Sequence, residues 1–391
     1  MKRRIMDVVL EDLNKKMVFI SGPRQTGKTT LAKILAENAH SHYYNWDNDR
    51  DRMAIKKNEI DADAEFLIFD EIHKNRSWRN WIKGLFDTYK AEKRILVTGS
   101  ARLDIYRFGG DSLQGRYYSH RLHPVTYSEL KGFETFDYSE FFKLKKKVEL
   151  SKDLKKMCEL GGFPEPLLSG SLREAKRWRL SYGSRIVKDD IRDLESLHDL
   201  SKVELLLHRL PATVGSVLSI NSLREDLEVS FPTAKKWVEV LEKVYTVFRI
   251  LPFGPAKIKA VKKEPKLYFW DWSQIEDEAA RFENLIAVHL LRFVHWMEDV
   301  EGEKYELRFF KSTLDHEVDF IILKDKKPIC AIEVKLDDRP LDSNLKYFLE
   351  RIKVPYAFQV SLDGVKNFSP ESINGCKIRI CPAELLLANL P

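Results

Sequence analysis

The sequence predicts an α/β fold that begins with a mainly parallel sheet. Short apolar runs at 17–20, 66–69 and 95–97 alternate with segments of helical periodicity, as is typical of a parallel sheet with helices on both faces. The first run leads into a glycine-bounded loop and the second ends in a pair of acids. Ligands bind at the carboxyl ends of strands in such sheets, so the fold and a site are predicted together.

The elements of this first domain follow in order. A helix is expected at 5–16, a second strand at 41–47 and a long helix at 72–89. A fourth strand is expected at 94–100 and a fifth at 118–122. The aromatic residues of the long helix recur at helical spacing, which favours a buried core face over nucleotide stacking.

The loop after the first strand carries a phosphate-binding motif. Gly22, Gly27, Lys28 and Thr29 match the pattern GxxxxGK[ST], with a strand before it and a helix after it. The glycines let backbone N–H groups turn toward a phosphate chain, and the helix adds its partial positive N-terminus. Lys28 is expected to bridge the β- and γ-phosphates of ATP, and Thr29 to hold Mg²⁺. A flexible loop without a ligand is the alternative.

The expected nucleotide-binding residues form one continuous segment. They are Gly22, Pro23, Arg24, Gln25, Thr26, Gly27, Lys28, Thr29 and Thr30.

Hydrolysis requires carboxylates, and two follow the strand at 66–69. Asp70 is predicted to contact the Mg²⁺ shell, and Glu71 to polarise the attacking water. Helix N-capping by these acids is the competing interpretation.

Three more polar residues are expected near this edge. Thr98 and Ser100 end the fourth strand, where a hydroxyl can sense the γ-phosphate, and Ser100 is counted with the catalytic residues. Arg116 is the candidate for an arginine finger that stabilises the phosphate transferred in a neighbouring subunit. An ordinary surface arginine is the alternative.

These motifs resemble those of a known family. The segments GPRQTGKTT, FDEIH, VTGS, GRY and HPVTYSE are similar to those of prokaryotic AAA+-type ATPases of the AAA_14 family, which usually carry a DUF4143 domain after the ATPase. The resemblance implies an AAA+ ATPase whose C-terminal region is similar to restriction-endonuclease folds.

Composition limits the classes of protein. The 391 residues are enough for about two to four domains, and 43% hydrophobic content supports real cores. The net charge of +6 is compatible with nucleic acid without requiring it. Four cysteines lack a C-x-x-C spacing, so neither a disulfide framework nor a zinc site is indicated. No run is apolar enough to span a membrane and no signal-peptide core is present, so no membrane partner and a cytoplasmic location are expected.

Residues 201–255 predict a winged helix-turn-helix. Helices are expected at 203–210, at 221–227 and from 230 onward, and 245–252 reads as a strand pair or wing. The third helix would present Lys235, Lys236 and Lys243 outward, as in helices that enter a DNA groove. Such domains also serve as protein contacts, which remains the alternative.

The C-terminal region predicts a nuclease-like site. Strands are expected at 306–311, 317–323 and 329–335, after an amphipathic helix at 281–291 that carries Glu283. Asp319 precedes Glu333 and Lys335 with the spacing of D-(x)n-E-x-K sites. Glu283, Asp319 and Glu333 are predicted to hold a second Mg²⁺, and Lys335 to orient or deprotonate water. A relict nuclease fold used for binding or assembly is the alternative.

The predicted fold class is α/β: a P-loop NTPase parallel sheet with a helical lid, a winged-helix domain and a C-terminal α/β PD-(D/E)XK nuclease-like domain. The expected boundaries are 1–135 for the ATPase core, 136–200 for the lid, 201–255 for the winged helix and 256–391 for the DUF4143 domain. The predicted function is ATP hydrolysis that controls a DNA-facing half, with ATP, Mg²⁺, DNA and a homo-oligomeric or protein partner. The alternatives are a nucleotide-dependent protein-binding switch and an ATP-regulated DNA nuclease.

Overall fold

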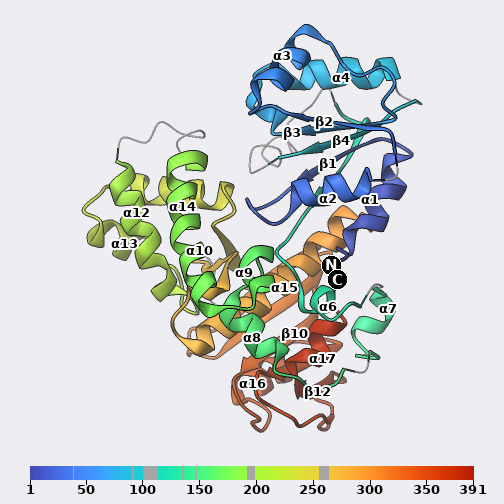
Figure 1. The fold of residues 1–391 in the computed structure, drawn as a ribbon. Helices are drawn as coiled ribbons and strands as arrows, with labels where there is room; N and C mark the ends of the chain where they lie inside the picture. The colour runs from blue at the N-terminus through green and yellow to red at the C-terminus, as the bar shows by residue number, and fades with distance from the viewer. Residues whose placement is uncertain are drawn as a thin grey trace. The chain divides into compact units, whose positions relative to one another are not determined.

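The computed structural model describes two compact units. Residues 38, 90–91, 100–112, 134–135, 147, 192–198 and 255–263, and the side chains of 139–140 and 187–189, lie outside the description. The first unit comprises Met1–Pro124 and Lys243–Tyr245, and the second comprises Val125–Glu242 and Thr246–Pro391 (Figure 1). Each is described by itself.

The first unit contains a five-stranded parallel sheet. Its strands are β1 (Met17–Ser21), β2 (Ser41–Asn45), β3 (Phe66–Asp70), β4 (Arg94–Thr98) and β5 (Tyr117–Arg121), in the order β2-β3-β4-β1-β5. Every pairing between neighbours is parallel, which confirms the predicted sheet. Because β4 lies between β1 and β3, the phosphate loop after β1 and the acids at the end of β3 lie at the same edge of the sheet, on either side of the end of β4.

Helices cover both faces of this sheet. They are α1 (Ile5–Leu13), α2 (Lys28–Leu35), α3 (Asp49–Lys57) and α4 (Trp78–Tyr89). The helix predicted at 72–89 is wrong at its start, because a 3₁₀ turn over Ile72–Lys74 is followed by an extended Asn75. The Asn75 side chain accepts the Ser77 N–H, at 3.1 Å, so it supports a turn. Trp78, Ile82, Leu85 and Phe86 of α4 are buried in the core, as predicted.

The second unit begins with short helices. They are α6 (Tyr127–Leu130), α7 (Tyr138–Phe141), α8 (Asp153–Leu160), α9 (Pro164–Ser169) and α10 (Leu172–Arg185), with a π-helical turn at Ile186–Ile191. Most described residues of 136–200 are helical, as predicted, although 142–146 and 148–152 are not. The chain leaves α8 at Gly161, whose φ is 86°, and a Cβ there would lie 2.7 Å from Asp271 Oδ1.

Three helices and a strand occupy the segment predicted as a winged helix. They are α12 (Leu200–Arg209), which leads into a 3₁₀ turn at Leu210–Thr213, α13 (Ile220–Asp226), α14 (Phe231–Lys243) and β6 (Val247–Pro252). The strand pair predicted within 245–252 is wrong, because β6 is one strand that pairs antiparallel with β7 (Lys266–Phe269) and parallel with β8 (Tyr305–Lys311). The winged-helix assignment stays a prediction.

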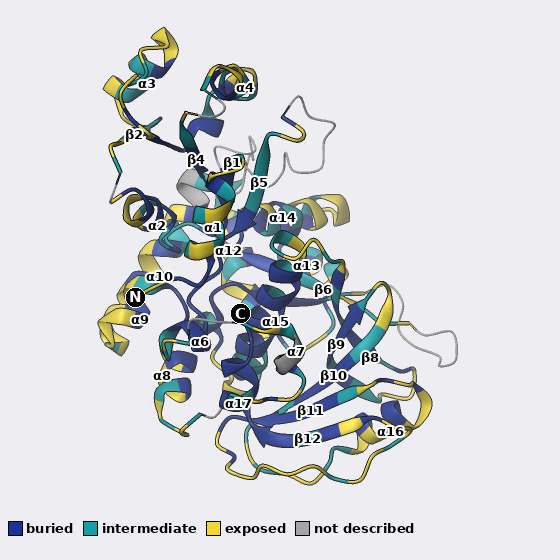
Figure 2. Cartoon of the chain, turned by 90° about the vertical axis from the view of Figure 1, so that its right-hand side faces the viewer, coloured by how far each residue is buried: buried dark blue, intermediate teal, exposed yellow. Residues whose placement is uncertain are grey.

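A seven-stranded mixed sheet forms the rest of the second unit. It adds β9 (Glu317–Lys324), β10 (Lys327–Lys335), β11 (Tyr356–Ser361) and β12 (Lys377–Pro382), in the order β12-β11-β10-β9-β8-β6-β7. A 3₁₀ turn at Trp272–Gln274 leads toward α15 (Glu278–Asp299), and the remaining helices are α16 (Ser343–Arg351) and α17 (Ala383–Ala388). The interior positions of β9, β10 and β11 are buried (Figure 2). No helix in the described ranges is long and apolar enough to cross a bilayer.

His289 ties α6 to α15 inside the second unit. Its Nε2 accepts the Tyr127 backbone N–H at 2.9 Å, and its Nδ1 lies 2.8 Å from the Leu285 carbonyl oxygen. Both contacts are satisfied by the neutral ring that carries its proton on Nδ1. Burial lowers the pKa of His289 to about 4.

The pH dependence of stability tests this contact. The folded pKa of His289, about 4, lies below its ordinary value of 6.5, so the unfolded chain binds more protons between these pH values. The stabilisation by neutral His289 is therefore complete above pH 6.5 and is lost as the pH falls through 4. We expect His289→Gln to lose less unfolding free energy than the wild type over this interval in urea titrations. Equal losses in the two proteins would contradict the assignment.

Candidate functional site

The phosphate loop has a backbone that only glycine permits at one position. Gly22 has a φ of 140°, and a Cβ added there would lie 2.4 Å from the Leu122 carbonyl oxygen. Gly27, with a φ of 93°, turns the chain into α2. The loop therefore curls closely around its own backbone directly before a helix N-terminus, the arrangement that binds anions.

Side chains hold the loop in this shape. Lys28 Nζ donates to the carbonyl oxygens of Gly22 at 2.9 Å and Pro23 at 2.7 Å. The buried Arg3 donates to the Thr26 carbonyl oxygen at 3.0 Å and to that of His123 at 2.6 Å. Arg3 was not predicted, since its place in the basic run Lys2–Arg4 gives no signal of a contact made to residues far along the chain.

Asp70 is the centre of the site. Its Oδ2 accepts hydrogen bonds from Thr29 Oγ1 at 2.8 Å and Tyr43 OH at 2.6 Å, and its Oδ1 accepts one from Thr98 Oγ1 at 2.7 Å. Thr29 and Asp70, predicted from motifs 41 residues apart, are thus in direct contact. Thr98 contacts the carboxylate through the hydroxyl predicted to sense phosphate. Burial and the Asp70 carboxylate raise the pKa of Tyr43, so its hydroxyl stays a donor.

Glu71 is placed differently from a helix cap. It has a left-handed backbone, with a φ of 57°, and its side chain makes no capping hydrogen bond to the following turn. Its Oε2 lies 3.4 Å from His73 Nε2 and 3.9 Å from Lys74 Nζ. Burial raises the pKa of Glu71 to about 7, against the opposing effect of Lys28 and Lys74. The N-capping alternative is therefore wrong for Glu71, and its role in hydrolysis stays a prediction.

The other predicted residues of this site differ in how they are held. Thr26 Oγ1 donates to the Pro23 carbonyl oxygen at 2.8 Å, while Thr30 is exposed on α2. Arg24 and Gln25 lie half-buried in the loop, and Gln25 has a φ of 63°. Ser100 lies outside the described residues.

Arg116 is paired within its own unit. Its Nε donates to Asp87 Oδ1 at 2.8 Å and its Nη2 to Asp87 Oδ2 at 3.2 Å, which is a two-pronged contact with α4. A role toward a neighbouring subunit stays a prediction.

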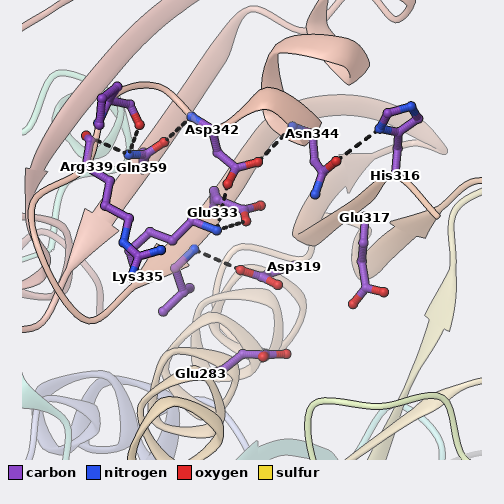
Figure 3. A network of polar contacts seen from close by, with 12 residues as sticks. Glu283, His316, Glu317, Asp319, Glu333, Lys335, Arg339, Asp342, Asn344 and Gln359 are labelled. Atoms are coloured by element: carbon purple, nitrogen blue, oxygen red, sulfur yellow. Dashed lines mark hydrogen bonds and ion pairs between the residues drawn. The ribbon is translucent and has the colours of Figure 1, made fainter.

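A second cluster of charged residues lies on β9 and β10 (Figure 3). Ile332 is opposite Phe320 in the antiparallel pair, which brings Glu333 beside Asp319. Asp319 Oδ2 accepts the Val334 N–H at 2.8 Å. Lys335 Nζ lies 2.8 Å from both Glu333 Oε1 and Asp342 Oδ2. Asp319, Glu333 and Lys335 therefore lie close together, as their spacing in the sequence predicted.

Glu283 approaches the cluster from α15 and has cationic and hydroxyl partners. Its Oε1 accepts from Tyr268 OH at 2.7 Å and lies 3.2 Å from Lys266 Nζ. Lys266 is 1% exposed and also pairs with Glu317. Sequence analysis missed Lys266 and Tyr268, since only the pairing of β7 into the sheet brings them to α15.

Burial dominates the electrostatics of this cluster. It raises the pKa of Asp319 well above its ordinary value, and the nearby Glu333 and Glu283 raise it further. Burial also raises the pKa of Glu333 to about 7, although Lys335 opposes the shift. Glu333 Oε2 is buried and has no hydrogen-bond partner. Within the described ranges, no three His, Cys, Asp or Glu side chains converge closely enough to hold a metal ion, so metal binding stays a prediction.

Family comparisons cover most of the chain. A model described as an AAA domain, AAA_14, matches residues 14–131, and DUF4143 matches 279–372. The chain therefore carries an AAA_14 domain in its N-terminal part and a DUF4143 domain in its C-terminal part. A further domain of unknown function, DUF8612, matches 151–275 between them.

Individual proteins similar to this chain were also found. Uncharacterized protein MJ1544 of Methanocaldococcus jannaschii is 24% identical over 89% of this chain and 81% of its own length. Uncharacterized protein MJ1637 of the same organism is 28% identical over 68% of this chain, which spans only 62% of that relative. Among solved structures, a single-substitution variant of RuvB from Thermotoga maritima is 18% identical over 62% of this chain and 87% of its own, with a TM-score of 0.30.

The helix predicted to face DNA, α14, carries exposed lysines but is nearly balanced in charge. Lys235, Lys236 and Lys243 are exposed on α14, as predicted. Lys235 Nζ lies 3.9 Å from Glu239, however, and Arg249 Nε lies 2.7 Å from Glu242 Oε1. DNA contact by α14 stays a prediction.

Proposed function

We propose that this chain binds and hydrolyses ATP with Mg²⁺ in its N-terminal unit, and that the nucleotide state controls a DNA-facing C-terminal half. The contact between Thr29 and Asp70 carries the first part of the proposal. Oxygen atoms of hydroxyl and carboxylate groups are ligands that Mg²⁺ prefers. Here the two groups meet beside a loop whose backbone conformation leaves no room for a Cβ at Gly22.

The residues of the loop divide the work of binding. The backbone N–H groups of 22–29 and the first turn of α2 would bind the phosphates, and Lys28 would exchange its two loop carbonyls for phosphate oxygens. Thr29 would hold Mg²⁺ directly, and Asp70 would act on its shell. When bound, Mg²⁺ supplies neutralisation of the charge that develops on the transferred phosphate.

Glu71 is the proposed general base. It follows Asp70 directly, and its pKa of about 7 matches the range in which a carboxylate can take a proton from water and release it again. Burial that raises this pKa also keeps bulk water from competing for the carboxylate oxygens. His73 and Lys74 lie within ion-pair distance and would limit how far the side chain turns.

The alternative function is a nucleotide-dependent switch that binds another protein and cleaves nothing. Turnover measured with and without duplex DNA separates the two, since only the DNA-controlled protein should respond to it.

Two substitutions separate binding from hydrolysis. We expect Lys28→Ala to abolish tight ATP binding or turnover, because the cationic contact to the β- and γ-phosphates is removed. Glu71→Gln should retain ATP binding and lose turnover, because an amide keeps the shape of the side chain without its basicity. Equilibrium binding of a fluorescent ATP analogue and phosphate release measure the two effects. The exposed pair Lys57→Ala and Glu59→Gln are matched controls, and unchanged turnover in either site variant would remove the proposal.

A third substitution tests assembly. If Arg116 reaches the γ-phosphate in a neighbouring subunit, Arg116→Ala should lower turnover by on the order of 10³-fold without weakening ATP binding. Mixing it with Lys28→Ala protein should restore part of the activity, since mixed interfaces pair an intact loop with an intact arginine. Asp87→Ala removes the resting partner of Arg116 and should keep turnover. An equal loss in Asp87→Ala would instead indicate that the ion pair is structural.

A second candidate function, favoured by one observation, is a Mg²⁺-dependent nuclease site in the C-terminal domain. The buried Glu333 Oε2 has no hydrogen-bond partner beside the half-buried Asp319, and two carboxylates so close together repel unless a proton or cation lies between them. Asp319, Glu333 and Glu283 would hold the ion, and Lys335 would orient water. The contact between Lys335 and Glu333 counts against this function, since it already compensates one of the two charges.

Thermal unfolding tests the ion site directly. We expect Mg²⁺ or Mn²⁺ to raise the melting temperature of the wild type, and Asp319→Asn to abolish that gain and any DNA cleavage while ATP turnover continues. Asp315→Asn is the matched control, because Asp315 is an exposed acid with a left-handed backbone that asparagine tolerates. If neither ion changes the melting temperature of the wild type, the nuclease function is contradicted, and binding of DNA or protein remains as the function of this domain.

A further inference from the structure

Helix α10, which is labelled in Figure 1, carries a concentration of positive charge. Its span, Leu172–Arg185, contains five basic residues and one acidic residue, in a chain whose net charge is only +6. Arg173, Lys176 and Arg177 are all exposed and stand at i, i+3 and i+4, so they share one face of the helix.

Aromatic packing fixes the direction of this face. Trp178 and Tyr182 are buried on the opposite side of α10, with their ring centroids 4.6 Å apart. Both rings also contact Phe163, at 5.0 and 5.1 Å. Arg179, at the edge, donates to the Ser273 carbonyl oxygen at 2.8 Å. The helix is therefore anchored along one side, and the three basic side chains point outward.

The basic side chains on this face of α10 differ from those of α14, because they form no ion pair. Among the residues that the structure describes, none pairs with Arg173, Lys176 or Arg177. On α14, by contrast, Lys235 has Glu239 one turn away, and the neighbouring Arg249 has Glu242.

Uncompensated like charges on one helix face are costly. Like charges one helical turn apart, such as Arg173 and Arg177, repel each other and destabilise a helix, so a partner that brings negative charge would relieve repulsion present in the free protein. Protein–protein interfaces are depleted of lysine but enriched in arginine, whereas both residues contact DNA phosphates. The charge of this face therefore matches a polyanionic backbone better than an apolar or mixed protein surface.

We propose that the face of α10 formed by Arg173, Lys176 and Arg177 binds the phosphodiester backbone of DNA. This inference rests on the proposed function, because it assigns the DNA-facing surface to α10 in place of α14. The contacts are to phosphates, so binding does not depend on base sequence and falls steeply with salt.

The experiment compares two matched variants of the full chain. Arg173→Gln/Lys176→Gln/Arg177→Gln removes the α10 charges, and Lys235→Gln/Lys236→Gln removes charges from α14. Glutamine has a helix propensity close to those of lysine and arginine, so both variants should keep the wild-type circular dichroism melt. Fluorescence anisotropy of a labelled random-sequence duplex is measured over a series of salt concentrations.

We expect the α10 variant to bind more weakly at every salt concentration and to reduce the slope of log Kobs against log salt by roughly 2 to 3. Arg173→Lys/Arg177→Lys, which keeps the charges, should restore the slope. A wild-type slope in the α10 variant, or a loss of DNA affinity confined to the α14 variant, overturns the assignment to α10. Either result leaves the proposal of a DNA-facing C-terminal half standing. Absence of wild-type DNA binding in a sample that hydrolyses ATP overturns both DNA proposals, as does binding only to an acidic peptide.

Discussion

The carboxylate of Asp70 organises the edge of the N-terminal sheet. It accepts hydrogen bonds from hydroxyls on α2, β2 and β4, three elements that are distant in the sequence. Hydrogen bonds to a charged group contribute about 1.5–3 kcal/mol each, but these donors are neutral and leave the negative charge in place. The strand order β2-β3-β4 makes this convergence possible, because it puts β3 between the two strands that supply Tyr43 and Thr98.

The acids of the C-terminal cluster have partners of a different kind. There the acids are approached by ammonium groups, with Lys266 beside Glu283 and Lys335 beside Glu333. An ammonium group cancels the charge that would attract a metal ion, whereas a hydroxyl orients the carboxylate and preserves that charge. The two clusters are therefore not equivalent as cation sites, and only the first keeps its central acid surrounded by neutral hydroxyl donors.

The sequence predicts contacts well where a motif and a strand end coincide. Thr29 and Asp70 each follow a buried strand, and parallel strands end at one edge, so their meeting follows from the pattern. Tyr43 is a residue of β2 whose contact with Asp70 requires the register that places Asn45 beside Asp70. Lys266 reads as an ordinary surface lysine, and it becomes buried only because β7 pairs with β6 and brings it to Glu283. Neither the register nor this pairing is encoded in local periodicity.

The helix predicted at 72–89 begins only at Trp78, and this late start lies next to the unusual backbone of Glu71. The periodicity of apolar residues runs through 72–86, but the backbone at Glu71 is left-handed, and its N–H donates to the Thr98 carbonyl oxygen at 2.9 Å. A left-handed glutamate costs free energy of order 1–3 kcal/mol, and such strain persists where surrounding contacts fix it. Here the bond to β4 ends the strand and turns the chain, so Glu71 leaves the strict alternation of β3 next to Asp70. Glu71, which directly precedes the misplaced start of the helix, is therefore the residue whose side-chain direction the proposed chemistry requires.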